Sequence, residues 1–131
     1  MKKLAIGLLV LFVLAACASK PSASVQGEWE LVSYNQTPAA SDADTSINFG
    51  SDGNLNANVG CNVLNGDYNV DGDAITFGAI ASTKMLCQGA VGEQELGTLA
   101  VFQGSGNFLI DGNTLTITSA DGNSSIVLER K

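Results

Sequence analysis

The sequence predicts a mainly β (α+β) fold: a small, strongly curved antiparallel sheet or barrel-like domain with one packed helix. Three observations support this class. Short runs of alternating or β-branched residues recur at intervals of roughly 8 to 12 residues. Glycine-containing turns separate these runs, among them Asp71-Gly72 and Asp111-Gly112. A single segment, 90–105, departs from this pattern and shows helical spacing instead.

The N-terminal residues have the features of a secretory signal. Lys2 and Lys3 precede an apolar run over 4–14, which is shorter than the roughly 20 residues that span a bilayer. The following stretch, LAAC, resembles the bacterial lipobox and ends at Cys17. This resemblance implies cleavage before Cys17, diacylglyceryl transfer to its thiol, and N-acylation with a fatty acid such as palmitate. An ordinary signal without lipidation is the alternative.

Three parts of the chain are therefore predicted: a lipoprotein signal peptide (1–16), a lipidated tether (17–26) and one domain (27–131). The tether is small and polar, as flexible linkers are. Two or three acyl chains on one residue hold a protein stably at a membrane surface. Alanine at position 18 resembles the pattern of outer-membrane sorting. The expected location is the periplasmic face of the outer membrane, with the membrane bound through the lipid on Cys17.

The net negative charge of the chain restricts the kinds of molecule that it can bind. The whole chain has a formal charge of −7, and loss of Lys2 and Lys3 with the signal would make it −9. A surface of that sign repels nucleic acid, so no nucleic-acid partner is expected. The 115 residues after the signal suffice for one domain with a modest core.

The strands are expected where aromatic and β-branched residues alternate with polar ones. Each Asp-Gly pair lies between two such runs, and we expect it to form the two central residues of a type I′ hairpin turn. The expected strands, in order, lie near 28–34, 45–50, 54–61, 67–70, 74–78, 107–110, 114–119 and 124–130.

The helical segment 90–105 has a weak intrinsic preference for helix. Val91, Glu95, Leu96, Leu99 and Phe102 fall at near-helical spacing. Gly92 and Gly97 each disfavour a helix by about 1 kcal/mol relative to alanine. The helix must therefore pack on the sheet to be stable.

Two cysteines remain after Cys17. Outside the cytoplasm, paired cysteines normally form disulfides, so Cys61 and Cys87 are expected to be bonded. Their separation of 26 residues predicts about 3.5 kcal/mol of stabilisation. Metal binding and a cysteine nucleophile are weaker readings, because the chain has no histidine. Cys61 as a plain core residue is a further alternative. Reduction should loosen residues 83–102 first.

Motifs with apparent chemistry have simpler explanations. The stretch 67–72 (DYNVDG) matches the start of a calcium loop, but the twelfth position is Gly78 rather than glutamate. Glu93 and Glu95 could form an acid–base pair, yet near the start of a helix they are better explained by the helix dipole. No catalytic group, metal site or cofactor is predicted, and the protein is expected not to be an enzyme.

Three asparagines lie on one face of a single expected strand. Asn54, Asn56 and Asn58 alternate with apolar residues, although asparagine is depleted in strands. They form either the solvated face of the strand or a hydrogen-bonding strip for a glycan or for a partner's backbone.

Four stretches together resemble the META domain family, which includes the heat-inducible lipoprotein HslJ. The most specific parts are Gly60-Cys61-Asn62, Asn65-Gly66 with Tyr68, and Thr83-Lys84-Met85 with Cys87; GEWELVS (27–33) and GEQEL (92–96) add to the match. The resemblance implies a β-rich barrel-like domain with a helix and an envelope-associated role. Members are linked to heat stress and novobiocin tolerance, without an established catalytic activity.

These observations predict a non-enzymatic envelope lipoprotein that acts as an interaction module in envelope stress tolerance. The partner would be an envelope protein of unknown identity. The expected contact patch comprises Asn62, Asn65, Tyr68, Thr83, Lys84 and Met85. The alternative is a small binding protein. It would either hold an apolar ligand behind Trp29, Phe49, Phe77 and Phe102 or inhibit a periplasmic hydrolase.

Overall fold

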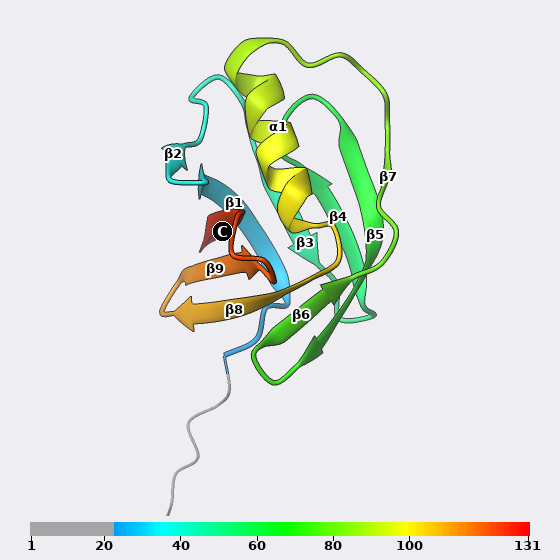
Figure 1. The fold of residues 1–131 in the computed structure, drawn as a ribbon, viewed down its shortest axis with the longest axis vertical. Coiled ribbons are helices and arrows are strands. Elements are labelled where there is room, and N and C mark those ends of the chain that lie inside the picture. The colour runs from blue at the N-terminus through cyan, green and yellow to red at the C-terminus, as the bar shows by residue number, and fades with distance from the viewer. Residues whose placement is uncertain (1–22) are drawn as a thin grey trace, which may run out of the picture.

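A computed structural model describes residues 23–131 (Figure 1). The predicted signal peptide and Cys17 lie outside the described residues. Within 23–131, no helix is both long and apolar enough to cross a membrane. The elements in chain order are β1 (Gly27–Tyr34), β2 (Thr37–Pro38), β3 (Ser46–Phe49), β4 (Asn54–Asn58), β5 (Val63–Asp71), β6 (Ala74–Phe77), β7 (Ala81–Ser82), α1 (Gly89–Val101), β8 (Ser105–Asp111), β9 (Thr114–Ser119) and β10 (Ser125–Arg130).

Eight strands form a closed antiparallel barrel. Each is paired with the next in the order β10-β9-β8-β6-β5-β4-β3-β1, and β1 then pairs with β10 to close the ring. The short strands β2 and β7 are added beside β1 and β5. Helix α1 packs across the barrel and contacts β1, β9 and β10 (Figure 1). The predicted mainly β class with one packed helix is confirmed, and the curved sheet is a closed barrel.

Alternation along each strand determines what lies inside the barrel. In β4, Leu55 and Ala57 are buried while Asn54 and Asn56 are exposed. The interior is apolar because successive side chains of a strand point to opposite faces. It holds Trp29, Ile47, Phe49, Leu55, Leu64, Ile75, Phe77, Phe102, Leu115, Ile117, Ile126 and Leu128.

The two predicted Asp-Gly hairpins exist, but the predicted turn type is wrong. Asp71 still pairs with Ala74 and Asp111 with Thr114, so each aspartate is the last strand residue and glycine begins the turn. Gly72 and Gly112 have φ of 62° and 59°, and the residues after them do not have positive φ. Glycine at the first central position with positive φ there alone is the pattern of a type II′ turn.

The start of the domain lies closer to the N-terminus than the predicted boundary at residue 27. Val25 is only 3% exposed and belongs to the core, and its carbonyl accepts a hydrogen bond from the Trp29 indole at 2.7 Å. The Arg130 guanidinium lies 4.1 Å from the centre of the Trp29 ring and donates to the carbonyls of Ser24 and Gln26. Residues 24–26, expected in a flexible tether, are therefore held on the barrel.

The buried face of helix α1 differs in part from the one that its apolar spacing predicts. Leu96, at helical spacing with the other apolar residues, is 71% exposed. Gln94, Thr98 and Val101 are buried although the spacing did not predict it, and the predicted positions Glu95 and Phe102 are buried as well. The end of the helix packs Val101 and Phe102 into the core, whereas Gln94 and Glu95, nearer its start, bond to backbone groups of the loops at the end of the barrel.

The two interior glycines of the helix, Gly92 and Gly97, lie where it touches its neighbours closely. A Cβ on Gly92 would lie 2.5 Å from the Cys87 carbonyl oxygen, and one on Gly97 would lie 2.5 Å from Cδ2 of Tyr34. Glycine lowers the helix propensity at these two positions, but a larger residue would not fit against Cys87 and Tyr34.

Candidate functional site

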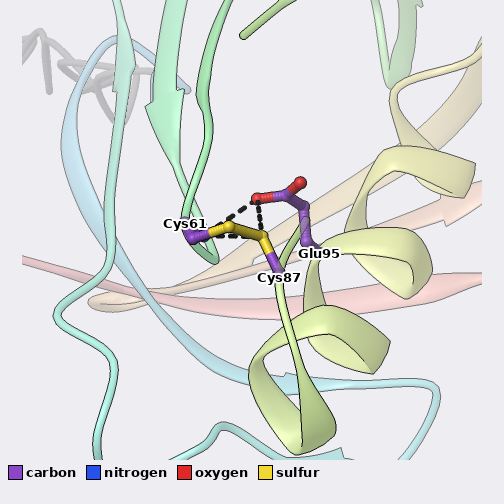
Figure 2. A group of neighbouring side chains, drawn as sticks. All are labelled: Cys61, Cys87 and Glu95. Atoms are coloured by element: carbon purple, nitrogen blue, oxygen red, sulfur yellow. Dashed lines mark hydrogen bonds between the residues drawn. A yellow bond between two sulfur atoms is a disulfide. The ribbon is translucent and has the colours of Figure 1, made fainter. Parts of the chain in front are cut away.

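Three of the stretches that carry the family resemblance, 60–62, 83–87 and 92–96, meet near the start of α1. Cys61 follows β4, Cys87 precedes the helix, and Glu95 lies in its second turn (Figure 2). A disulfide joins Cys61 and Cys87, whose Cα atoms are 5.5 Å apart, and both residues are half-buried. The structure therefore contains the predicted disulfide. We call Cys61, Asn62, Thr83, Cys87 and Glu95 the Glu95 cluster.

Glu95 is the acceptor around which this cluster is built. Its Oε2 accepts hydrogen bonds from the backbone N–H groups of Cys61 and Asn62, at 3.0 and 2.9 Å. Its Oε1 accepts from the Asn62 side-chain amide at 2.6 Å. Cys87 Sγ lies 3.4 Å from Oε2 (Figure 2). Glu95 is only 6% exposed, so its carboxylate accepts hydrogen bonds from donors that lie inside the fold.

The helix-dipole interpretation of Glu93 and Glu95 is therefore wrong. The first turn of α1 contains no acidic residue, because the helix begins at Gly89. Glu93 is exposed, whereas Glu95 points into the cluster. Sequence reasoning missed this role because the donors come from a loop 33 and 34 residues away along the chain.

Asn62 joins the same cluster to the loop before the helix. Its Oδ1 accepts from the Thr83 hydroxyl at 2.9 Å and from the Met85 backbone N–H at 2.7 Å. Its Nδ2 donates to the Met85 carbonyl as well as to Glu95. Thr83 in turn accepts from the Val63 backbone N–H at 3.0 Å. One buried side-chain amide thus ties Thr83 and Met85 to Glu95 of the helix.

Gln94 and Gly60 complete the contact between the helix and the loop. The Gln94 side chain donates to the Val59 carbonyl and accepts from the Ala40 backbone N–H, each at 2.7 Å. A Cβ on Gly60 would lie 2.6 Å from Glu95 Oε2, so glycine there admits the carboxylate. The motif Gly60-Cys61-Asn62 thus has a structural explanation for each of its residues.

The predicted contact patch is brought together only in part. Asn62 and Tyr68 were predicted to be surface contacts, but Asn62 is 4% exposed and Tyr68 9%. Tyr68 donates its hydroxyl to the Gly50 carbonyl at 2.6 Å, and its burial, with Asp52 nearby, raises its pKa. Asn65 is exposed on β5 and takes no part in the hydrogen bonds of the Glu95 cluster. Both corrections arise because the hydrogen-bonding tips of these side chains turn toward backbone groups inside the fold.

The remaining patch residues lie on an exposed segment next to the Glu95 cluster. Thr83, Lys84 and Met85 are exposed, and Met85 has 64% of its surface accessible. Leu86, which the sequence did not single out, is 87% exposed, and Leu96 on the helix is 71% exposed. Met85, Leu86 and Leu96 line one hollow of about 380 Å³ together with Gly92 and Glu93. We call Met85, Leu86 and Leu96 the apolar rim.

The groups of the Glu95 cluster hold the loop and the helix together, and its sulfur atoms are not available as metal ligands. Cys61, Cys87 and Glu95 bring potential metal-ligand atoms within 4.8 Å of one another, but the two sulfurs are bonded to each other and offer no thiolate. The aromatic residues expected behind an apolar ligand cavity fill the core instead. Phe77 lies 5.0 Å from Phe102 and 6.5 Å from Phe49, measured between ring centroids.

Fold and site together define a small closed β-barrel domain whose single helix is joined to the barrel by a disulfide and a buried carboxylate. The META domain family matches residues 22–131. The chain therefore belongs to the META domain family. No curated protein matches the sequence.

Several solved structures share this fold. An NMR structure of a protein whose source is not named has a TM-score of 0.66 at 21% identity, covering 79% of this chain and 88% of its own. An NMR structure of a protein from Burkholderia xenovorans gives 0.64 at 17%, covering 91% and 99%. A crystal structure of a duf4847 family protein from Bacteroides vulgatus gives 0.55 at 15%, covering 81% and 93%. At these identities the likeness concerns the fold alone.

Proposed function

We propose that this protein is a non-enzymatic lipoprotein of the bacterial envelope that presents the apolar rim to a protein partner. The observation that carries the proposal is the combination of exposure and rigidity at residues 83–87. Exposed apolar side chains on a mobile loop would lose conformational freedom on binding. Here the disulfide and the Asn62 hydrogen bonds have already fixed the backbone.

The location of the rim suits a protein anchored through Cys17. In Figure 1 the first described residues lie at the lower end of the molecule, and the segment between β7 and α1 lies at the upper end. An anchor at Cys17 would therefore attach through the end of the described chain that lies opposite the segment between β7 and α1. The META family resemblance adds the expected physiological setting, which is tolerance of heat and of novobiocin-type antibiotics.

Lys84 gives the rim a distinct charge. It is adjacent to Met85, and the next basic residues along the sequence are Lys20 and Arg130. A single cation beside apolar side chains, on an otherwise acidic chain, favours a partner with an apolar anchor and a nearby carboxylate. A periplasmic hydrolase inhibited at this rim would be one such partner.

Site-specific photocrosslinking in intact cells tests the proposal. We expect a photoreactive residue at Leu86 or at Leu96 to capture the same protein. Leu109 on β8 is the matched control, because it is 69% exposed but lies outside the Glu95 cluster. Capture should weaken when Cys61 and Cys87 are both serine. Equal capture from position 109, or different proteins from positions 86 and 96, would contradict the proposal.

The anchor has its own test. Intact-mass spectrometry of the protein extracted from membranes should show the diacylglyceryl and acyl groups on a chain that begins at Cys17. The Cys17→Ser variant should lack that mass and remain unprocessed. A mature serine variant that still carries lipid would rule the anchor out.

A further inference from the structure

The outer face of β1, β3, β4 and β5 carries a row of side chains that differs from an ordinary solvated surface. Glu28 pairs with Asn48, Asn48 with Asn56, and Asn56 with Asn65. These four residues therefore form one line across four neighbouring strands, which we call the asparagine row. Because neighbouring strands lie about 4.8 Å apart, the row spans about 14 Å.

The amides of this row are free to bind a ligand. Among residues 23–131, Asn48, Asn56 and Asn65 make no side-chain hydrogen bond, whereas the neighbouring Asn54 is bonded to Asp52. Their outward direction is fixed by the barrel, because the adjacent residues Leu55, Ala57 and Leu64 are buried. Each amide offers two donors and one acceptor in a plane. Three amides at paired positions of neighbouring strands make a regular hydrogen-bonding surface.

The surface around the row is hollowed on both sides of Asn56. One hollow, of about 330 Å³, lies between Asn56 and Asp67 and is lined by Asn54, Asn65 and Gly66. The other, of about 250 Å³, includes Glu28, Asn48, Asn58 and Val63. Asn56 is common to both, so a ligand lying along the row would meet it at its centre.

The charges of this face restrict the ligand. Among residues 23–131, Glu28 and Asp67 are the charged residues that line the two hollows, and no lysine or arginine of that part of the chain does. Anionic polymers are therefore repelled. Protein partners bind mainly through buried aromatic and apolar anchors, and Val63, 48% exposed, is the exposed apolar side chain that lines these hollows. A neutral glycan matches better, because its hydroxyl and acetamido groups both donate and accept hydrogen bonds. The N–H and the C=O of a trans acetamido group point in opposite directions, so different side-chain amides of the row can accept from one and donate to the other.

We propose that the asparagine row binds a neutral glycan that carries acetamido groups, at a site separate from the apolar rim. The contacts are hydrogen bonds from the three amides to successive polar groups of a short oligosaccharide. The binding is weak for one oligosaccharide, because each hydrogen bond replaces one to water. We expect a dissociation constant of about 1 mM for a trisaccharide.

Nuclear magnetic resonance titration of the isotopically labelled domain tests this site directly. Triacetylchitotriose is the probe, and cellotriose, which has the same linkage without acetamido groups, is the control sugar. We expect saturable shifts of the side-chain amide signals of Asn48, Asn56 and Asn65 with the first sugar. Asn56→Ala should weaken binding roughly tenfold, since one amide supplies about two hydrogen bonds. Asn65→Ala provides a second exposed substitution with the same expectation.

Asn107→Ala is the matched control, because Asn107 is an exposed asparagine on β8, outside the row. It should leave binding unchanged. Three results would each overturn the proposal: no saturable shift up to about 10 mM sugar, equal binding of cellotriose, or equal weakening by Asn107→Ala.

Discussion

Replacing Glu95 with glutamine is expected to destabilise the domain by about 2 to 3 kcal/mol. The two carboxylate oxygens together accept three hydrogen bonds, from Cys61 N–H, Asn62 N–H and the Asn62 side chain. Glutamine keeps one acceptor oxygen and places an NH₂ group against a donor. At least one buried donor is then left without a partner, and the assisting negative charge is lost. Urea unfolding of the oxidised protein measures the difference.

Glu93→Gln is the control for this change. Glu93 lies two residues earlier on the same helix and is exposed, so its substitution removes the same charge without touching the cluster. We expect its effect to stay within about 0.5 kcal/mol. If Glu95→Gln is as mild as Glu93→Gln, the carboxylate does not hold the loop.

Replacing Cys61 and Cys87 together by serine is expected to destabilise the domain by about 3.5 kcal/mol, because the bond closes a loop of 26 residues. The structure refines the earlier expectation that residues 83–102 loosen first. Val101 and Phe102 are fully buried in the core, so the end of α1 has support of its own. We therefore expect faster hydrogen exchange mainly over residues 84–91, ahead of the Asp-Gly hairpins.

Two measurements decide this prediction. Thiol titration of protein taken from cells should find no free thiol at Cys61 or Cys87, and two free thiols would mean that the bond does not form there. Hydrogen exchange of the serine variant should differ from that of the oxidised protein over residues 84–91. Unchanged exchange would show that Asn62 and Glu95 hold the loop without the disulfide.

Combining Glu95→Gln with the two cysteine substitutions tests whether the Glu95 carboxylate and the Cys61–Cys87 disulfide stabilise the domain as one unit. Glu95 accepts from Cys61 N–H and touches Cys87 Sγ, so the residues share contacts. Their effects on stability should then differ from the sum of the separate effects by more than about 0.5 kcal/mol.

Local patterns in the sequence determined most of the barrel. Alternation in β4 predicted which of its residues lie inside, and Asp71-Gly72 and Asp111-Gly112 predicted two hairpins that exist. These signals are readable because strand periodicity and turn chemistry depend on residues next to one another in the chain. The Cys61–Cys87 bond was also predictable, since only two cysteines remain once Cys17 is assigned to the lipid.

The tertiary structure alone decided the character of the site. Asn62 and Glu95 are 33 residues apart, and nothing near either residue in sequence indicates that one is the other's partner. Glu95 resembles any acidic helix residue, and Asn62 any polar loop residue, until the barrel closes and brings them together. The same closure turned Leu96 outward and placed Gln94 and Thr98 inside, against the apolar pattern of the helix. A buried polar group must find its hydrogen-bond partner wherever the fold provides one, so its role depends on distant residues and is not encoded by neighbours in the chain.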